Sequence, residues 1–117
     1  MLTSKEIAHL AVKALDDKLA RDIQILKTDK VTVLADYFIL CTAGNSTHGK
    51  TLADEVDKVL SQAGEQPLRR EGYRSGGWTL LDFGCGVVHI FSEEMRSFYS
   101  LDRLWSDAEK IDYKDFL

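Results

Sequence analysis

Two short apolar runs in the last third of the chain carry its clearest structural pattern. They span Trp78–Phe83 and Val87–Phe91 and flank a Gly84-Cys85-Gly86 break. Apolar runs of this length on either side of a glycine turn predict a β-hairpin. Ser92 follows the second run at once, with two glutamates behind it. An N-cap hydroxyl and first-turn acids both complement the free N–H groups at a helix start, so a helix is expected directly after the hairpin.

The length of the hairpin loop decides which side chains share a face of the sheet. We favour a two-residue loop at Gly84-Cys85, in which Gly84 supplies the positive φ of a type II′ turn. That register puts an apolar set on one face: Leu81, Phe83, Val88 and Ile90. The other face mixes apolar groups with a carboxylate and an imidazole: Trp78, Leu80, Asp82, His89 and Phe91. A three-residue loop including Gly86 would pair Asp82 with Val88 and move His89 to the opposite face from Asp82.

The rest of the chain predicts two long helices and three further strands. Thr3 and Glu6 form a capping box for the first helix. The second helix is expected to start at an N-cap on Asn45 or Ser46 and to run to about Ala63, before Gly64. Strands are predicted at Asp22–Leu26, at the almost continuously apolar Asp36–Thr42, and at the charged, edge-like Leu68–Glu71.

These elements predict one α/β domain over residues 1–117, with a mixed β-sheet of about five strands and flanking helices. Val31–Leu34 fits either a short strand or an ordered loop. The residues after Ser92 fit one interrupted helix, or two short ones over Glu93–Tyr99 and Leu101–Ser106. The acidic and aromatic segment Asp107–Leu117 favours no particular structure.

Composition narrows the class of protein. Of the 117 residues, 44% are hydrophobic and 29% charged, as in ordinary soluble domains. No apolar run reaches the ~20 residues that cross a bilayer, and the first residues lack a secretory apolar region, so no membrane association is expected. Cys41 and Cys85 lack metal-ligand spacing and indicate buried thiols in the reducing cytoplasm.

The net charge of −4 argues against a protein that works mainly by phosphate contacts, so little direct RNA contact is expected. Arg69, Arg70 and Arg74 form the one local basic cluster, and a solvated edge strand is the simpler interpretation of it. An acidic domain can still join an RNA-rich assembly by binding one of its basic proteins.

Two groups of residues offer chemistry. Asp82 and His89 can approach across the hairpin, but no nucleophile shares their face, and a polar pair is the simpler interpretation. The turn after Asp36–Thr42 presents Gly44 and Ser46 at a helix start, where an anion can bind, yet it lacks a complete phosphate-binding motif. His48 beside Ser46 suggests a nucleophile and base on proximity alone. No third ligand completes a metal site, and no cofactor is indicated.

Two segments resemble the signatures of the ribosomal silencing factor family (RsfS, also called Iojap). The first, from Trp78, reads W-T-L-L-D-F-G-x-G-V-V-H-I-F-x-x-x-x-R-x-F-Y-x-L-D-x-L-W-x-D-A. The second, Ala35–His48, reads A-D-Y-F-I-L-C-T-A-G-N-S-T-H. The resemblance implies an α/β fold related to nucleotidyltransferases. Gly44 and Ser46 resemble the glycine–serine motif of that superfamily, but its paired metal-binding acids are not evident, which implies a non-catalytic copy.

The resemblance implies a partner-binding protein without enzymatic activity. Family members bind the large ribosomal subunit through ribosomal protein L-fourteen, hinder joining of the small subunit and damp translation when nutrients are scarce. A homodimer in isolation is also implied. The residues expected to bind the partner are Trp78, Leu80, Asp82, His89, Arg96 and Tyr99. The alternative is a small nucleotidyltransferase-like enzyme that holds a phosphate at Gly44-Ser46.

Overall fold

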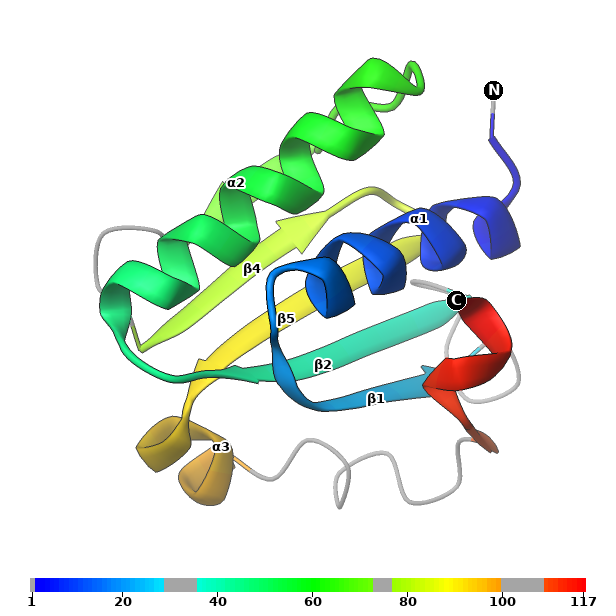
Figure 1. Ribbon diagram of the computed structural model, residues 1–117. Helices are drawn as coiled ribbons and strands as arrows, with labels where there is room; N and C mark the ends of the chain where they lie inside the picture. The colour runs from blue at the N-terminus through cyan, green and yellow to red at the C-terminus, as the bar shows by residue number, and fades with distance from the viewer. Residues whose placement is uncertain (1, 29–35, 73–76, 100–108) are drawn as a thin grey trace.

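The computed structural model describes residues 2–28, 36–72, 77–99 and 109–117 (Figure 1). Within these ranges the chain forms a mixed α/β fold, as predicted. The elements in chain order are α1 (Ser4–Asp17), β1 (Arg21–Lys27), β2 (Tyr37–Ala43), α2 (Ser46–Gln62), β3 (Arg69–Glu71), β4 (Trp78–Asp82), β5 (Gly86–Ser92), α3 (Glu93–Tyr99), β6 (Glu109–Ile111) and the 3-10 helix η1 (Tyr113–Phe116).

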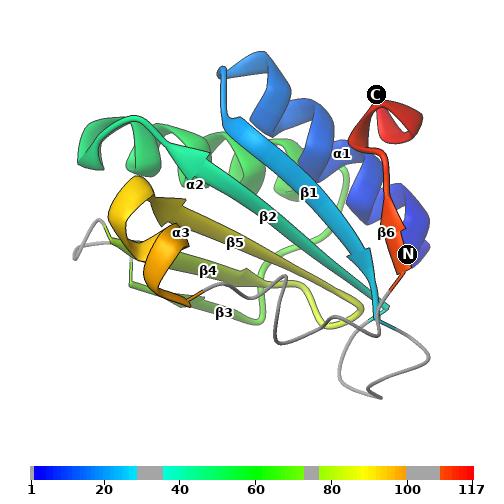
Figure 2. The ribbon, with the colours of Figure 1, turned by 90° about the horizontal axis from the view of Figure 1, so that it is seen from below.

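The strands form one sheet in the order β3-β4-β5-β2-β1-β6. The two central strands, β2 and β5, run parallel, and the other neighbouring pairs are antiparallel. Helices α1 and α2 lie across one face of this sheet (Figure 1). Helix α3 follows the end of β5 and lies beside the sheet, away from α1 (Figure 2). The sheet therefore has one face covered by two long helices and a second face that α3 meets at one end.

Both long helices begin with the predicted capping groups, and α2 also ends at the predicted glycine. The Thr3 hydroxyl accepts from the Glu6 N–H at 3.1 Å, and the Glu6 carboxylate accepts from the Thr3 N–H at 3.0 Å. Hydrogen bonding to Thr3 lowers the pKa of Glu6, and the bond from the Thr3 backbone has the larger effect. Asn45 is the N-cap of α2 and accepts from the His48 N–H at 2.7 Å. Gly64, at φ 95°, ends that helix.

The main core lies between the two long helices and the sheet. All seven residues of β2 are buried, which confirms the expected central strand covered on both faces. Each fully buried aliphatic side chain contributes about 1.5–3 kcal/mol. The apolar stripes of α1 and α2 pack against the sheet through Ile7, Val12, Leu15, Leu52, Val56 and Leu60.

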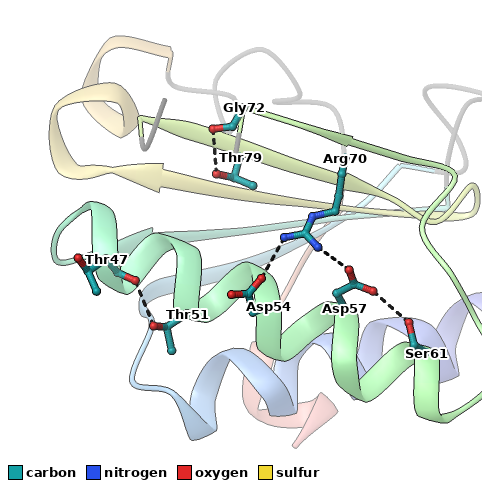
Figure 3. A network of polar contacts seen from close by, with 8 residues as sticks. All are labelled: Thr47, Thr51, Asp54, Asp57, Ser61, Arg70, Gly72 and Thr79. Carbon is teal, nitrogen blue, oxygen red and sulfur yellow. Dashed lines mark hydrogen bonds and ion pairs between the residues drawn. The ribbon is translucent and has the colours of Figure 1, made fainter. Parts of the chain in front are cut away.

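The edge strand β3 is tied to α2 by Arg70 (Figure 3). Its guanidinium donates to the Asp57 carboxylate at 2.6 Å and to the Asp54 carboxylate at 3.1 Å. Asp57 also accepts from the Ser61 hydroxyl at 3.0 Å (Figure 3). All three residues of β3 are exposed, so the predicted solvated edge is confirmed, and its arginines are neutralised by acids of the same chain.

The C-terminal segment adds a sixth strand where about five were expected. Strand β6 pairs antiparallel with the end of β1, and η1 follows it. Phe116 of η1 is buried and meets the Tyr37 ring edge-on, with centroids 5.7 Å apart. The sequence predicted no structure here. The segments Val31–Leu34 and Leu101–Ser106 lie outside the described residues, as does Arg74.

Both cysteines are free, as expected, but only Cys41 is buried as predicted, whereas Cys85 is half-buried. Burial raises the pKa of the Cys41 thiol to about 12, and burial is also the main cause that raises the pKa of Cys85. Neither thiol is therefore activated as a nucleophile. None of the described helices is long and apolar enough to cross a membrane.

Candidate partner-binding surface

The hairpin of β4 and β5 has the predicted two-residue loop. Phe83 donates its backbone N–H to the Gly86 carbonyl at 2.9 Å, which closes the turn over Gly84 and Cys85. Gly84 has φ 86° and Cys85 is not at positive φ, the combination required by a type II′ turn. Leu80 lies opposite His89, and Asp82 opposite Val87. The three-residue alternative is therefore excluded.

The two faces of the hairpin separate as expected. One face belongs to the main core under α1 and α2, with Leu81, Phe83, Val88 and Ile90. The other face contributes to a second apolar cluster, which also receives side chains from β1, β2 and α3: Leu26, Phe38, Leu40, Trp78, Leu80, Val87, Phe91 and Met95. We call this second group the aromatic face. It is the surface on which the partner-binding residues were predicted.

Trp78 and Leu80 form the half-buried rim of the aromatic face. The Trp78 ring stacks on Phe91 with centroids 5.2 Å apart. A depression of about 240 Å³ opens beside them, lined by Glu71, Gly72, Trp78 and Leu80. Gly72 approaches Trp78 so closely that an added Cβ would lie 1.9 Å from the Trp78 carbonyl oxygen. A glycine at this position therefore lets β3 run close against the tryptophan, a contact that sequence reasoning missed.

His89 is buried rather than exposed. The residue is 4% exposed, and its ring packs against Phe38 and Phe91. The expectation of an exposed imidazole was wrong, because the Trp78 indole lies next to the ring and donates to its Nδ1 at 3.2 Å. Nε2 is buried and has no hydrogen-bond partner in the described part of the chain. Burial lowers the pKa of His89 to about 4, against a smaller opposite effect of the Asp82 charge.

Asp82 is bonded to its own hairpin and neighbouring strand. One carboxylate oxygen accepts from the Gly84 N–H at 2.8 Å, which supports the turn. The other accepts from Arg69 of β3 at 3.2 Å. The predicted hydrogen-bonded pair of Asp82 and His89 is therefore wrong, because the nearer turn N–H and guanidinium take the carboxylate. Asp82 affects His89 only through the electrostatic effect of its charge.

Arg96 lies away from the Trp78 rim. It projects from α3 and donates through Nη1 to the Asp22 carbonyl at 3.2 Å and to the Thr42 hydroxyl at 3.1 Å. These bonds tie α3 to β1 and β2 rather than to the hairpin. Tyr99 is the last residue of α3, and its side chain lies outside the described residues. The structure therefore brings together Trp78, Leu80, Asp82 and His89, and separates Arg96 from them.

The turn before α2 uses its own polar groups internally. The Gly44 N–H, which an anion at this turn would need, donates to Nδ1 of His48 at 2.8 Å. The other ring nitrogen of His48 lies 2.7 Å from the Lys18 carbonyl. With both nitrogens engaged by backbone groups, His48 links two loops and is not placed as a base for Ser46. Among the described residues, no group of three or more His, Cys, Asp or Glu could hold a metal ion.

The sheet and its helices form a small α/β domain, and the aromatic face presents a tryptophan at the rim of the sheet. Tryptophan is enriched at protein interfaces, so these features are typical of a protein-binding domain. A family model described as "Ribosomal silencing factor during starvation" matches residues 1–117. The chain therefore belongs to the ribosomal silencing factor family, which confirms the resemblance seen in the sequence.

Relatives and solved structures agree with this assignment. Proteins named "Ribosomal silencing factor RsfS" from Bacillus subtilis and Halalkalibacterium halodurans are 35% and 34% identical over 111 residues, with 95% of this chain and 94% and 95% of theirs covered. The chloroplastic protein Iojap of Zea mays is 30% identical over 103 residues, which are 86% of this chain and 43% of that protein. A crystal structure from Chromobacterium violaceum is 36% identical, with a TM-score of 0.88 over 90% of this chain and 88% of that one.

Proposed function

We propose that this protein silences translation by binding the large ribosomal subunit through ribosomal protein L-fourteen and hindering association with the small subunit when nutrients are scarce. Membership of the ribosomal silencing factor family supports the ribosome as the target. The protein acts by occupying a surface and carries out no reaction. It works in the cytoplasm, without a membrane.

The observation that carries the proposal is the half-buried Trp78 beside a depression on the sheet rim. Aromatic side chains that are partly held by their own fold are frequent anchors of protein interfaces. Glu71 lines the same depression with a side chain that is 59% exposed; its carboxylate contacts Arg69 at 3.4 Å and, in this proposal, also attracts a basic ribosomal protein. Trp78 and Leu80 contact the partner directly in this proposal.

The other predicted residues act in different ways. His89 acts as a positioning residue, because it accepts the indole N–H of Trp78. Asp82 supports the turn at the end of the same strand and brings negative charge to the rim. Arg96 and Tyr99 of α3 complete the proposed partner-binding set. Direct RNA contact is small, since the net charge is −4 and the arginines of β3 are paired with carboxylates.

The test is sedimentation of purified subunits. Large and small subunits are mixed with the purified protein, and the fraction of joined ribosomes is measured on a sucrose gradient. The wild type is expected to lower that fraction and to travel with large subunits alone. Trp78→Ala is expected to weaken binding by about 2 kcal/mol or more, the loss typical of a central aromatic anchor. Leu19→Ala, at an exposed leucine outside the aromatic face, is the matched control.

A melt of each variant separates lost binding from lost folding, because Trp78 is half-buried. Trp78→Phe retains an aromatic ring for stacking on Phe91 but removes the indole N–H and one of the two fused rings. If Trp78→Ala binds large subunits as well as the wild type while folded, the rim is not the docking surface. If the wild type travels equally with both subunits, the proposed anti-association mechanism fails.

Two further properties belong to the proposal. Calorimetric titration with nucleotides and magnesium is expected to give no binding heat. The Gly44 N–H, which a phosphate bound at this turn would need, is already bonded to His48. Heat that saturates would favour the nucleotidyltransferase-like alternative instead.

The protein forms a homodimer in isolation, and sedimentation velocity at micromolar concentration measures it. A monomeric profile over the whole concentration range would contradict the dimer.

A further inference from the structure

A second opening lies at the outer edge of β1, away from the Trp78 rim. It has a volume of about 470 Å³ and is lined by Ala20, Asp22, Ile23, Gln24, Arg96 and Tyr113. Strand β6 pairs only with Ile25–Lys27, so no described strand lies along the outer edge of the first half of β1. The volume falls within the ~300–1,000 Å³ range of small-molecule sites. We call this opening the β1 pocket.

In the β1 pocket, the guanidinium of Arg96 has no carboxylate partner among the described residues. Within that part of the chain it donates only to neutral groups, the Asp22 carbonyl and the Thr42 hydroxyl, and both bonds use Nη1. The other three arginines in the described part of the chain all contact carboxylates, as the pairs Arg21–Glu93, Arg69–Asp82 and Arg70–Asp57 show. Nε and Nη2 of Arg96 are thus available to an oxyanion, which a guanidinium binds in a two-pronged manner.

The same pocket contains an acid that Arg96 does not neutralise. Asp22 meets Arg96 through its backbone carbonyl, and its carboxylate is in no ion pair among the described residues. Asp22 is also held at φ 51°, in the left-handed region that non-glycine residues seldom adopt. Strained backbone of this kind gathers at binding sites. One cation and one anion therefore line a single pocket without forming a salt bridge with each other.

We propose that the β1 pocket binds a free α-amino acid with an apolar side chain. The α-carboxylate pairs with the open side of the Arg96 guanidinium, and the α-ammonium pairs with Asp22. The side chain lies against Ala20, Ile23 and Tyr113. A zwitterion matches one positive and one negative group, whereas a phosphate dianion beside Asp22 would be left with excess negative charge. This site goes beyond the proposed ribosome binding, with which it shares only Arg96.

The experiment is a titration of the full chain followed by two-dimensional NMR, with L-leucine as the probe. Saturable shifts of the backbone amides over residues 20–24 are expected, with a dissociation constant of about 1 mM or less. The matched analogues are 4-methylpentanoate, which lacks the ammonium, and 3-methylbutylamine, which lacks the carboxylate. Each is expected to bind at least about tenfold more weakly than leucine, because it loses one charged contact. Inorganic phosphate is titrated as the competing anion.

Two variants assign the contacts. Asp22→Asn keeps a side chain that tolerates positive φ, and it should weaken leucine about tenfold without weakening 4-methylpentanoate, whose carboxylate loses a neighbouring like charge. Arg96→Gln should weaken both carboxylates without weakening the amine, because the ammonium loses a neighbouring like charge. Lys13→Gln, an exposed charge on α1, is the control and should change none of them.

Several results would overturn the proposal. Equal binding of leucine and 4-methylpentanoate would make the pocket a simple anion site. Tighter binding of phosphate would exclude the zwitterion. Shifts that do not saturate by about 20 mM, or that lie away from residues 20–24, would show that leucine does not occupy this pocket. None of these results bears on ribosome binding, which the subunit assay measures separately.

Discussion

The indole N–H of Trp78 donates to Nδ1 of His89 across 3.2 Å, joining the half-buried rim of the aromatic face to its buried centre. Nδ1 must carry a lone pair to accept this bond, so the imidazole is neutral and its proton is on Nε2. Protonating the ring would remove that lone pair and place a charge between Phe38 and Phe91. The orientation of the proposed anchor is therefore coupled to the protonation of one buried histidine.

The first prediction is a loss of stability in mild acid. The folded pKa of His89 is about 4 and its ordinary value is 6.5, so between these values the unfolded chain binds a proton that the folded chain does not. The contribution of neutral His89 to stability is therefore fully present above pH 6.5. It falls as the pH drops toward 4 and does not fall further below that value. The shift amounts to about 3 kcal/mol over the whole window. Urea unfolding at a series of pH values measures it.

The control for this prediction is His89→Phe, which keeps an aromatic ring and removes the titration. Carboxylates titrate in both proteins, so the difference between the two pH profiles isolates His89. The variant should be less stable at pH 7 by about 1 kcal/mol, since the Trp78 indole loses its acceptor. Parallel profiles for the two proteins would mean that the imidazole is not held neutral.

The second prediction concerns Asp82. Its carboxylate accepts from the Gly84 N–H and from Arg69, whose side chain is 60% exposed. Asp82→Ala is expected to lower stability by about 1–2 kcal/mol, mainly through the turn. Asp82→Asn keeps an acceptor for the turn and should cost less than about 1 kcal/mol, because the exposed ion pair is weak. Thermal melts at low and high salt measure both. If Asp82→Ala melts like the wild type, the carboxylate does not support the turn.

The third prediction concerns the close approach of Gly72 to Trp78. Gly72→Ala places a Cβ 1.9 Å from the Trp78 carbonyl oxygen at φ 76°, so the backbone has to move. A loss of more than about 2 kcal/mol in urea unfolding is expected, together with weaker large-subunit binding. Gly64→Ala is the matched control, since its φ of 95° is equally unfavourable but no atom lies within 4 Å. Equal losses in both variants would mean that φ strain alone acts.

Local patterns predicted the hairpin, whereas strand β6 escaped them. The loop at Gly84 follows from neighbouring residues, because glycine fits the positive φ and alternation sets the two faces. The segment Glu109–Ile111 has a single apolar residue and becomes a strand only because the edge of β1 is there to pair with it. Such pairing depends on residues far away in the chain, which propensity does not record.

The candidate site shows the same division between local and distant causes. Alternation placed Trp78, Leu80, Asp82 and His89 on one face, and the register confirms it. It did not reveal that His89 is buried, because burial depends on Phe38 from β2 and on the position of the Trp78 ring. The sequence also did not show which group binds the Asp82 carboxylate. Arg69 reaches it only because β3 pairs with β4 in the sheet.

The last prediction is a stabilising substitution at Leu19. This residue follows α1 at φ 64°, and its N–H bonds to the Asp16 carbonyl at 3.0 Å, where a helix end favours glycine. Leu19 is 79% exposed, so little burial is lost on removing its side chain. Leu19→Gly should gain about 0.5–1 kcal/mol, since relief of the left-handed strain exceeds the added freedom of the unfolded chain. Urea unfolding measures the gain, and Leu19→Ala, which keeps the Cβ, should show none. A gain in both would assign the effect to the exposed leucine side chain instead of the backbone.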